Sequence, residues 1–474
     1  MPDLSPGARF ESDVPCRLDR LPWSRWHVRL VIALGVTWML DGLEVTLVGA
    51  VAPLLSRSDT LRLTDSQIGV AATIYLAGAI LGALVFGRLS DRFGRKRLFF
   101  VTLAVYVAAT ALTAASWSFA SFAFFRALTG AGIGGETSAV NSAIDELLPA
   151  RVRGRADLAI NGTYWLGTVF GAALTVAIIR ARVVPDALAW RLAFLLGAVL
   201  GTGILFLRQH LPESPRWLLL HGRVEDAEEV TRSIEEHVAR YHPLPPPGPA
   251  VPLEAKGSVT FGAIARELVQ HHPRRTILGL SLMIAQAFAY NGVFFTYALV
   301  LVSFYGVEPS AVGLYLIPFA IGNLLGPLVL GTLFDTVGRR VMIATTYLGA
   351  AALIVLAGLG LARGWLDATT QTALWSAAFF VASAAASSAY LTVSELFPVE
   401  LRGMAIALFY AIGTAAGGLV APALFGALVQ THERSRVFHA YLVAAALMAA
   451  GGIVAAFLGV PSERKSLEEL AHSR

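Results

Sequence analysis

Long apolar blocks recur along this chain, and they constrain its fold more than any other feature. Each block holds about 18 or more mostly apolar residues, which is enough for a helix to cross the ~30 Å hydrocarbon core of a bilayer. With 56% hydrophobic and 15% charged residues, the chain has too little polar surface for a soluble globule. The sequence therefore predicts twelve membrane-spanning helices, at residues 30–54, 67–87, 98–116, 119–146, 156–180, 191–208, 275–303, 309–333, 341–362, 370–394, 403–429 and 437–460.

The charges between the blocks predict the orientation of the chain. Cations gather in alternate loops, and the positive-inside rule makes that side cytoplasmic, with both termini there. This placement accounts for the net charge of +5 without a nucleic-acid partner. The first thirty residues are rich in charge and lack an apolar core with a small-residue cleavage site, so we expect no removable signal peptide. Cys16 is the sole cysteine of the sequence, which excludes an intrachain disulfide.

The middle of the chain is polar. The stretch VEDAEEVTRSIEEHVARY keeps apolar residues at three-to-four spacing, from Val224 to Tyr241, and predicts an amphipathic surface helix. HPLPPPGPAVP follows, which is too rich in proline for a helix and indicates a semi-rigid linker. We therefore expect a cytoplasmic N-terminal segment (1–29), a six-helix bundle (30–210), a cytoplasmic linker with short helices (211–274), a second six-helix bundle (275–460) and a cytoplasmic tail (461–474).

The two halves repeat each other. GRLSDRFGRKR, which contains Asp91, matches GTLFDTVGRR, which contains Asp335, at an offset of 244 residues. ELLPARVRG at Glu146 matches ELFPVELRG at Glu395 at an offset of 249 residues. Two motifs in the same order at nearly one offset indicate a duplicated six-span unit.

These motifs, together with RALTGAGIGGE at Arg126, PESPRWL at Pro212 and PSERKSLEEL at Pro461, resemble those of the major facilitator superfamily. Within it the chain is similar to the sugar porters and to the organic-ion and nicotinate-type permeases. The resemblance implies an all-α membrane protein with the major facilitator fold, twelve transmembrane helices in two pseudo-symmetric bundles. It implies a transporter, not an enzyme, whose partners are a small-molecule substrate, protons and the lipid bilayer. We expect a monomer in a bacterial-type inner or plasma membrane.

The resemblance also implies a cytoplasmic latch, or gate, that holds the halves together while the cavity faces outward. Acids at helix ends can accept hydrogen bonds from nearby arginines, and each exposed pair is worth about 0 to 1 kcal/mol, so it can break in every cycle. The alternative is that these charges only set the topology, although acids contribute little to orientation. The latch residues are expected to be Asp91, Arg95, Glu146, Arg153, Asp335, Arg339, Glu395 and Arg402.

Two acids, Asp41 and Glu44, interrupt the apolar run of the first span. A charge at the centre of a membrane helix costs about 2.5 to 3.5 kcal/mol even on the lenient insertion scale, so such acids are candidates for function. A spacing of three places both on one helical face. GLEVTLVG resembles the sugar-porter segment whose acid pairs with an arginine of the fourth span and takes up the coupling proton, here Glu44 and Arg126. The alternative is a static buried ion pair or a hydrated acid.

The resemblance places the substrate against the fifth, seventh and tenth spans. Amides that need partners in an apolar setting, and aromatic faces that can stack on a planar ligand, are the candidate contacts. The alternative for each single ring is helix packing. The candidate residues are Asn161, Tyr164, Trp165, Gln286, Tyr290, Asn291, Phe294, Phe295 and Tyr390.

Other motifs indicate no cofactor or metal. The G-x-G-x-x-G from Gly130 to Gly135 lies inside an apolar block and follows no strand, so close helix packing explains it better than nucleotide binding. We expect a proton-coupled importer of an aromatic or heterocyclic carboxylate such as nicotinate. A sugar or polyol carrier is the alternative, and an organic-cation carrier or a non-transporting sensor also stays open. If Glu44 occupies Arg126, a neutral or cationic ligand fits better than an anion.

Overall fold

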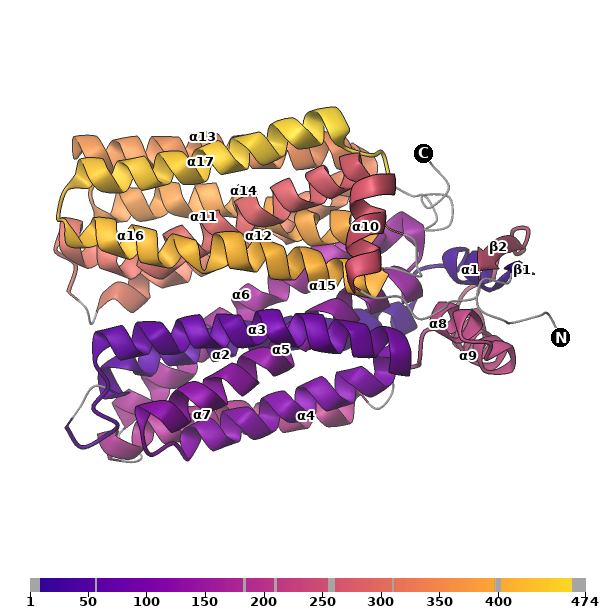
Figure 1. Cartoon of the computed structure of the whole chain (residues 1–474), viewed down its shortest axis with the longest axis horizontal. Helices are drawn as coiled ribbons and strands as arrows, with labels where there is room; N and C mark the ends of the chain where they lie inside the picture. The colour runs from indigo at the N-terminus through magenta and orange to yellow at the C-terminus, as the bar shows by residue number, and fades with distance from the viewer. Residues whose placement is uncertain are drawn as a thin grey trace.

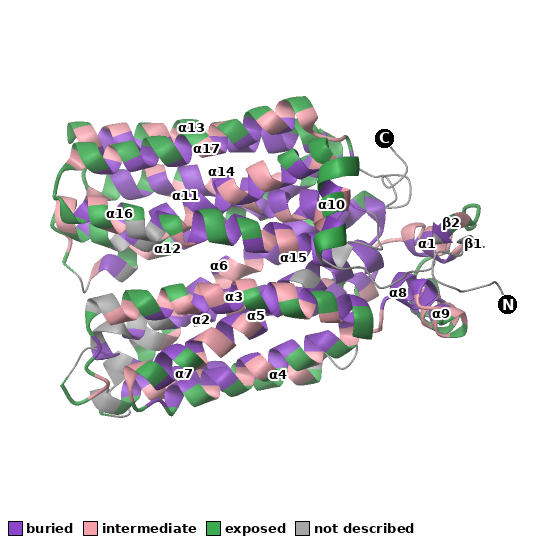
Figure 2. Ribbon diagram, viewed as in Figure 1, coloured by how far each residue is buried: buried purple, intermediate pink, exposed green. Residues whose placement is uncertain are grey.

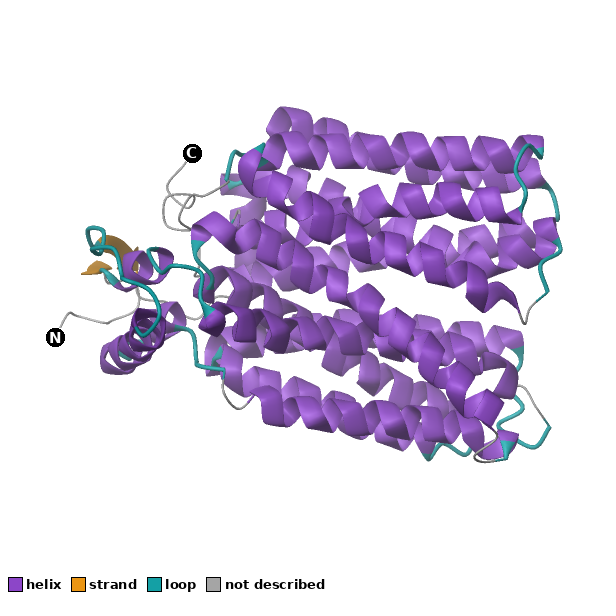
Figure 3. Cartoon of the chain, turned by 180° about the vertical axis from the view of Figure 1, so that it is seen from behind, coloured by secondary structure: helices purple, strands orange, loops and turns teal. Residues whose placement is uncertain are grey.

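The computed structural model describes residues 9–55, 58–181, 185–208, 211–254, 261–308, 311–395, 397 and 402–462. In these ranges the protein is a bundle of long helices in two halves, with a small polar cap at one end (Figures 1 and 3). The first half contains α2 (Arg25–Leu55), α3 (Asp65–Phe93), α4 (Arg95–Ala114), α5 (Phe119–Leu147), α6 (Ala150–Ala181) and α7 (Asp186–Arg208). The second contains α11 (Pro273–Tyr305), α12 (Val312–Thr336), α13 (Arg339–Arg363), α14 (Ala368–Glu395), the run α15 (Arg402–Gly413), η2 (Thr414–Gly418) and α16 (Val420–Gln430), and α17 (Arg434–Leu458).

All twelve predicted spans coincide with long helical segments. Among the described residues, nine helices are long and apolar enough to cross a membrane by themselves. The exceptions are α5 and α6, which carry several charges, and the eleventh segment, where the π-helical η2 divides two shorter helices. Large apolar side chains stand exposed on the outer faces, such as Leu81 (63%), Val199 (65%) and Phe457 (78%), as lipid contact requires. Figure 2 shows exposed segments on the outer helices and buried segments between the helices.

Close helix contacts explain the glycine-rich run of α5. A Cβ atom on Gly130 would meet the backbone carbonyl of Tyr75, and one on Gly134 would meet that of Ala79, both on α3. Because no side chain separates the two helices here, α3 and α5 pack backbone against backbone. The nucleotide-like motif is therefore a helix-packing surface.

The internal repeat is visible in the backbone. Gly94 and Gly338 occupy equivalent motif positions and have φ angles of 97° and 116°, a conformation that strongly favours glycine. Each glycine directly precedes a helix, α4 or α13, whose first residue is the motif arginine, Arg95 or Arg339. The same turn thus places an arginine at the same end of each half.

Contacts within each half and between the halves follow this arrangement. In the first half α2 packs on α6, and α5 packs on α3 and α4; in the second, α17 packs on α11 and α13, and α12 packs on α14. The two halves meet chiefly where α6 contacts α12 and α14, and where α15 contacts α3. The cavity described below lies between them.

The polar cap combines two distant parts of the chain, which the sequence did not predict. Its elements are β1 (Arg9–Ser12), α1 (Val14–Asp19), α8 (Pro215–Leu220), α9 (Val224–Ala239) and β2 (Val251–Glu254), while α10 (Phe261–His271) lies against α11 and α15. β1 and β2 form an antiparallel pair. The amphipathic pattern predicts α9 well, and Ala227, Ile234 and Val238 are buried. The prediction is wrong for Tyr241, which lies beyond the helix and is exposed.

Ion pairs join α1 to α9 in this cap. Arg17 lies 2.7 Å from Glu235 and 2.6 Å from Glu228, and Arg20 also pairs with Glu235. Burial acts against ionisation of the Glu235 carboxyl, but the hydrogen bonds from Arg17 and Arg20 outweigh it and lower its pKa. The contribution of Glu235 to cap stability is therefore present above its ordinary value of 4.5 and is lost as pH falls through the lower value of the folded state.

We expect Glu235→Gln to detach α1 from α9, because it leaves two arginines without their shared carboxylate. Limited proteolysis of the N-terminal segment should become several-fold faster at pH 7. The neighbouring exposed Glu236→Gln is the matched control and should leave the rate unchanged. Equal rates for both variants would contradict this account of the cap.

Candidate functional site

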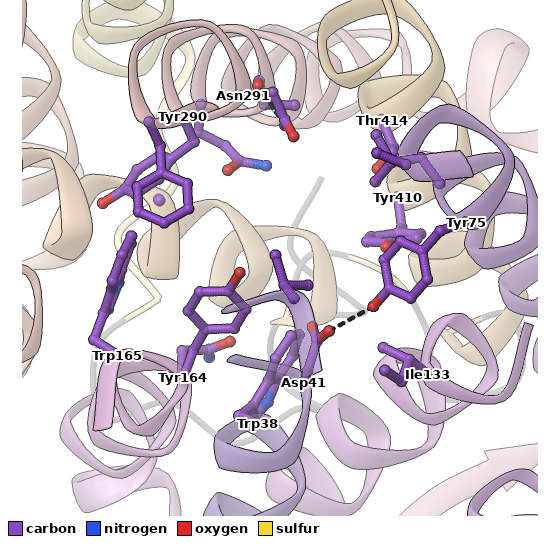
Figure 4. Close-up of a pocket in the computed structure, with 18 of the residues that line it drawn as sticks. Trp38, Asp41, Tyr75, Ile133, Tyr164, Trp165, Tyr290, Asn291, Tyr410 and Thr414 are labelled. Atoms are coloured by element: carbon purple, nitrogen blue, oxygen red, sulfur yellow. Dashed lines mark hydrogen bonds between the residues drawn. The ribbon is translucent and has the colours of Figure 1, made fainter. Parts of the chain in front are cut away.

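A cavity of about 400 Å³ lies between the two halves. Its walls come from α2, α3, α5 and α6 on one side and from α11, α14, α15 and η2 on the other. Figure 4 shows rings and polar groups of both halves pointing toward the same space. Ten of the sequence-predicted residues line it, namely Asp41, Arg126, Asn161, Tyr164, Trp165, Gln286, Tyr290, Asn291, Phe294 and Tyr390.

Glu44 and Arg126 form a direct ion pair in the interior of the first half. The guanidinium Nη1 of Arg126 donates to Glu44 Oε1, and the two residues are 0% and 2% exposed. The Tyr106 hydroxyl lies 3.4 Å from the other carboxylate oxygen. Glu44 is not part of the cavity wall, whereas Arg126 is. Arg126 therefore connects the hidden acid to the cavity.

Asp41 lies on the cavity wall itself. Its Oδ1 accepts a hydrogen bond of 2.8 Å from the Tyr75 hydroxyl (Figure 4). The Arg126 guanidinium carbon lies 4.5 Å from the centroid of the same Tyr75 ring, a cation–π distance. Tyr75 thus contacts the acid through its hydroxyl and the arginine through its ring.

The amides lie where the sequence predicted, and two of them are oriented by the helix backbone. Asn161 Nδ2 donates to the Asp157 carbonyl at 2.9 Å, and Asn291 Nδ2 donates to the Ala287 carbonyl at 2.7 Å. Each bond spans four residues of its own helix, so one donor of each amide is used locally. Both amides line the cavity, so each places polar atoms on its wall.

Aromatic rings line the cavity and also join the halves. Trp165 of α6 lies 5.2 Å from the Phe294 ring and 5.9 Å from the Tyr290 ring, both on α11. Trp38 of α2 lies 5.8 Å from Tyr390 of α14, again across the two halves. The predicted Phe295 belongs to α11, but its side chain lies outside the described residues.

Several wall residues were missed at the sequence level. Trp38 could have been suggested by its position one turn before Asp41, since residues three apart share a face. Tyr75 and Tyr410 carry no local signal, because a ring that lines a cavity and a ring that packs two helices look alike in sequence. The missed polar and aromatic residues are Trp38, Tyr75, Ser383, Ser387, Tyr410 and Thr414.

The predicted latch residues gather at the end of the bundle that bears the cap. Arg95 lies 3.3 Å from Asp91 and 3.0 Å from Glu146 in the first half. In the second half, Arg339 lies 2.7 Å from Asp335 and 2.9 Å from Glu395. The side chain of Arg402 lies outside the described residues, as does most of the PSERKSLEEL motif. The two triads repeat the same geometry.

Contacts across the halves at this end are fewer. The backbone N–H of Arg155 donates to Asp335 Oδ2 at 2.9 Å, and Arg153 lies 3.9 Å from Glu395 and 3.5 Å from Asp19 of the cap. The halves are therefore in contact at the latch end. Ile68 and Gly69, within the first turns of α3 at the opposite end, belong to the cavity wall, so the cavity extends away from the latch.

The sequence argument that the latch pairs are exposed, and so worth little, is wrong. Asp91, Arg95, Glu146, Arg153, Asp335, Arg339 and Glu395 are all at most 4% exposed. Removing one partner of a buried ion pair costs roughly 3 to 5 kcal/mol, because the other charge is left buried without compensation. The triads within each half are thus costly to break, and the few contacts across the halves are better suited to break in each cycle.

Two bundles of membrane-length helices around a central cavity with aromatic walls and a few polar groups define a membrane transport protein, and comparisons with known proteins place it more closely. The sequence model described as "Sugar (and other) transporter" matches residues 32–473, so the chain belongs to the sugar-transporter family of the major facilitator superfamily. The predicted fold class is confirmed.

Named relatives and solved structures agree with this membership. The chain is 27% identical to the niacin transporter NiaP of Acinetobacter baylyi over 97% of this chain and 99% of that protein. It is 33% identical to solute carrier family 22 member 7 of Bos taurus over 73% of this chain and 61% of that protein. The proton:xylose symporter XylE of E. coli, bound to 6-bromo-6-deoxy-D-glucose, shares 20% identity with a TM-score of 0.76 over 94% of this chain and 98% of that one.

Proposed function

We propose that the protein is a proton-coupled symporter that imports a small organic solute by alternating access. The observation that carries the proposal is the Glu44–Arg126 ion pair, in which the arginine lines the cavity and the acid does not. A proton on Glu44 removes the charge that holds Arg126, so the guanidinium becomes available to the cavity. Protonation and ligand binding then favour the same state.

The proposed substrate class is an aromatic or heterocyclic carboxylate such as nicotinate. Once Glu44 is protonated, a substrate carboxylate can replace it as the counter-ion of Arg126, and the substrate ring can stack on Tyr164, Trp165 or Tyr390. This class also agrees with the name of the niacin transporter relative. In this scheme one proton accompanies one anion.

From the sequence, a neutral or cationic ligand fits better than an anion if Glu44 occupies Arg126. Protonation of Glu44 changes this conclusion. With Glu44 ionised, Arg126 is neutralised and offers no free positive charge to the cavity, so an anion has no counter-ion there. With Glu44 protonated, Arg126 offers its charge and its donors to a carboxylate. An anion therefore requires the proton, and this requirement couples the two.

A second candidate, an organic cation, is favoured by one observation. Asp41 lies on the wall among aromatic rings, with Trp38, Tyr75 and Tyr164 shown beside it in Figure 4. A carboxylate surrounded by ring faces suits a cation, since the acid and the rings both attract positive charge. For this candidate, the substrate charge would be bound by Asp41 and not by Arg126.

Both candidates can be tested by uptake into proteoliposomes that contain the whole protein, with ligands that share one shape and differ in charge. Nicotinate, nicotinamide and nicotinamide methylated on its ring nitrogen carry negative, zero and positive charge on nearly the same ring, and glucose tests the sugar alternative. We expect nicotinate alone to accumulate, only with acid outside, and to lose accumulation with an uncoupler. Preferential uptake of the cation would replace the proposed class with the second candidate, and flux of glucose alone would reject both.

We expect Tyr75→Phe to weaken binding of the accumulated ligand. The change keeps the ring against Arg126 but removes the hydrogen bond to Asp41, so Asp41 can turn toward Arg126 and compete with the substrate carboxylate for it. A hydrogen bond to a charged group is worth about 1.5 to 3 kcal/mol. The KM of uptake should rise roughly tenfold or more. Tyr347→Phe is the control, because its hydroxyl donates to the Leu282 carbonyl at 3.0 Å away from the cavity. A KM that changes equally in both variants would show that Tyr75 acts only in packing.

A further inference from the structure

Asp157, on α6, is a buried acid that no part of the proposed function uses. It is 1% exposed, and neither of its carboxylate oxygens accepts a hydrogen bond of regular geometry in the described part of the chain. Within that part, the Asn161 side chain is the one polar group near enough to favour its ionised form by a weak hydrogen bond. The Asn161 amide donates its regular hydrogen bond to the backbone carbonyl of Asp157. Arg153 of the latch lies one turn before it and Asn161 of the cavity wall one turn after it, so Asp157 lies between the two.

The charged groups that face Asp157 do not compensate a negative charge. Asp145 on α5 and Glu395 on α14 are close enough to repel it, and Arg339 on α13 attracts it. The Arg339 guanidinium, however, already binds Asp335 and Glu395 at 2.7 and 2.9 Å. Asp157 is thus near two other acids and one arginine, and that arginine is already paired with other carboxylates.

An ionised carboxylate in this position would be costly. Burial removes the hydration of the carboxylate, and the like charges of Asp145 and Glu395 add to the cost. The attraction of Arg339 and the weak contact with Asn161 are smaller than these two effects. The neutral acid avoids both terms. Separation of the halves at the latch end would bring water to Asp157, and there the ionised form is the stable one.

We propose that Asp157 is a second proton-binding site, which holds a proton while the latch end is closed and releases it to the water at that end when the halves separate. The site is distinct from Glu44, which contacts Arg126 on the other side of the cavity wall. It requires no particular substrate. A rise in pH removes the proton and so shifts the protein toward the state that is open at the latch, because the closed state is the one that binds the proton more tightly.

A cysteine at the interface of the halves can report this opening. Gly331 of α12 is buried against α6, and a Cβ there would lie 3.5 Å from Leu158 Cβ and 3.6 Å from Arg155 Cα, which is ordinary contact. Gly331→Cys, in a Cys16→Ser background, should therefore fit the closed state and react with N-ethylmaleimide only when the latch opens. Gly262→Cys, on the exposed side of α10 with open space around it, corrects for the effect of pH on the thiol.

The test compares the ratio of the two labelling rates between pH 5.5 and 8.5, in the full-length protein in lipid nanodiscs. All variants also carry Glu44→Gln, so that the coupling acid does not contribute. With Asp157 present, we expect the ratio of the Gly331→Cys rate to the Gly262→Cys rate to rise about tenfold from pH 5.5 to 8.5. With Asp157→Asn the ratio should stay low at every pH. With Asp157→Glu it should again rise with pH.

Two results would overturn the proposal. An Asp157→Asn variant that keeps the full rise with pH would show that another group titrates. Fast labelling of that variant at every pH would show that the charge of Asp157 closes the latch. Monodisperse elution and an unchanged melting temperature establish that the variant is folded, and Asp157→Ser gives the same comparison if the Asn variant is not.

Discussion

Glu44→Gln is expected to abolish concentrative uptake and to leave exchange of substrate across the membrane intact. Gln keeps the size of the side chain but cannot bind or release the proton, so Arg126 is permanently available and no longer depends on pH. A gradient of one pH unit supplies about 1.4 kcal/mol per proton, enough for roughly tenfold accumulation by the parent protein. The variant should reach only the outside concentration, and counterflow of labelled ligand should persist.

Tyr106→Phe is the matched control for this prediction. It removes the hydroxyl 3.4 Å from Glu44 but keeps the acid and its arginine, so accumulation should remain. Full accumulation by Glu44→Gln would show that a residue other than Glu44 binds the coupling proton. Loss of counterflow together with accumulation would show instead that the ion pair is needed for the fold.

Gly154→Ala is expected to reduce transport more than tenfold. A Cβ at this position of α6 would collide with the Arg339 guanidinium and the Asp335 carboxylate of the other half. The halves could then not close at the latch end as they do here, and one of the two states needed for alternating access would be lost. The initial rate of uptake and the labelling of Gly331→Cys together measure the effect, with labelling becoming fast.

Gly203→Ala serves as the control, because a Cβ at that site on α7 meets no atom within 4 Å. It should transport at the parent rate. Normal transport by Gly154→Ala would mean that the contact between α6 and the Asp335–Arg339 pair is not part of the cycle.

The sequence predicted the fold better than it predicted the cap. Twelve apolar blocks and two repeated motifs leave few arrangements, because a helix in lipid must satisfy its own backbone. The pairing of β1 with β2 had no such signal. Arg9 and Glu254 are far apart in the chain, and four-residue strands carry too little pattern to be recognised.

The candidate site was partly predictable for a geometric reason. Residues three apart on a helix differ by about 60° in direction, so Asp41 and Glu44 can share a general face and still have different neighbours. Asp41 reaches the cavity while Glu44 lies behind its wall. Only the contacts of α2 with its neighbours decide this, and one sequence does not contain them. Asp157 was missed likewise, because a single Asp in a charged helix start resembles a solvated residue.

Proton movement with substrate tests the central claim most directly. Proteoliposomes at equal pH inside and outside would contain a trapped pH-sensitive dye, and nicotinate would be added outside, with protein-free liposomes as the blank. The account predicts acidification of the interior with the parent protein and none with Glu44→Gln. Entry of nicotinate through the parent protein with no change of internal pH would contradict it.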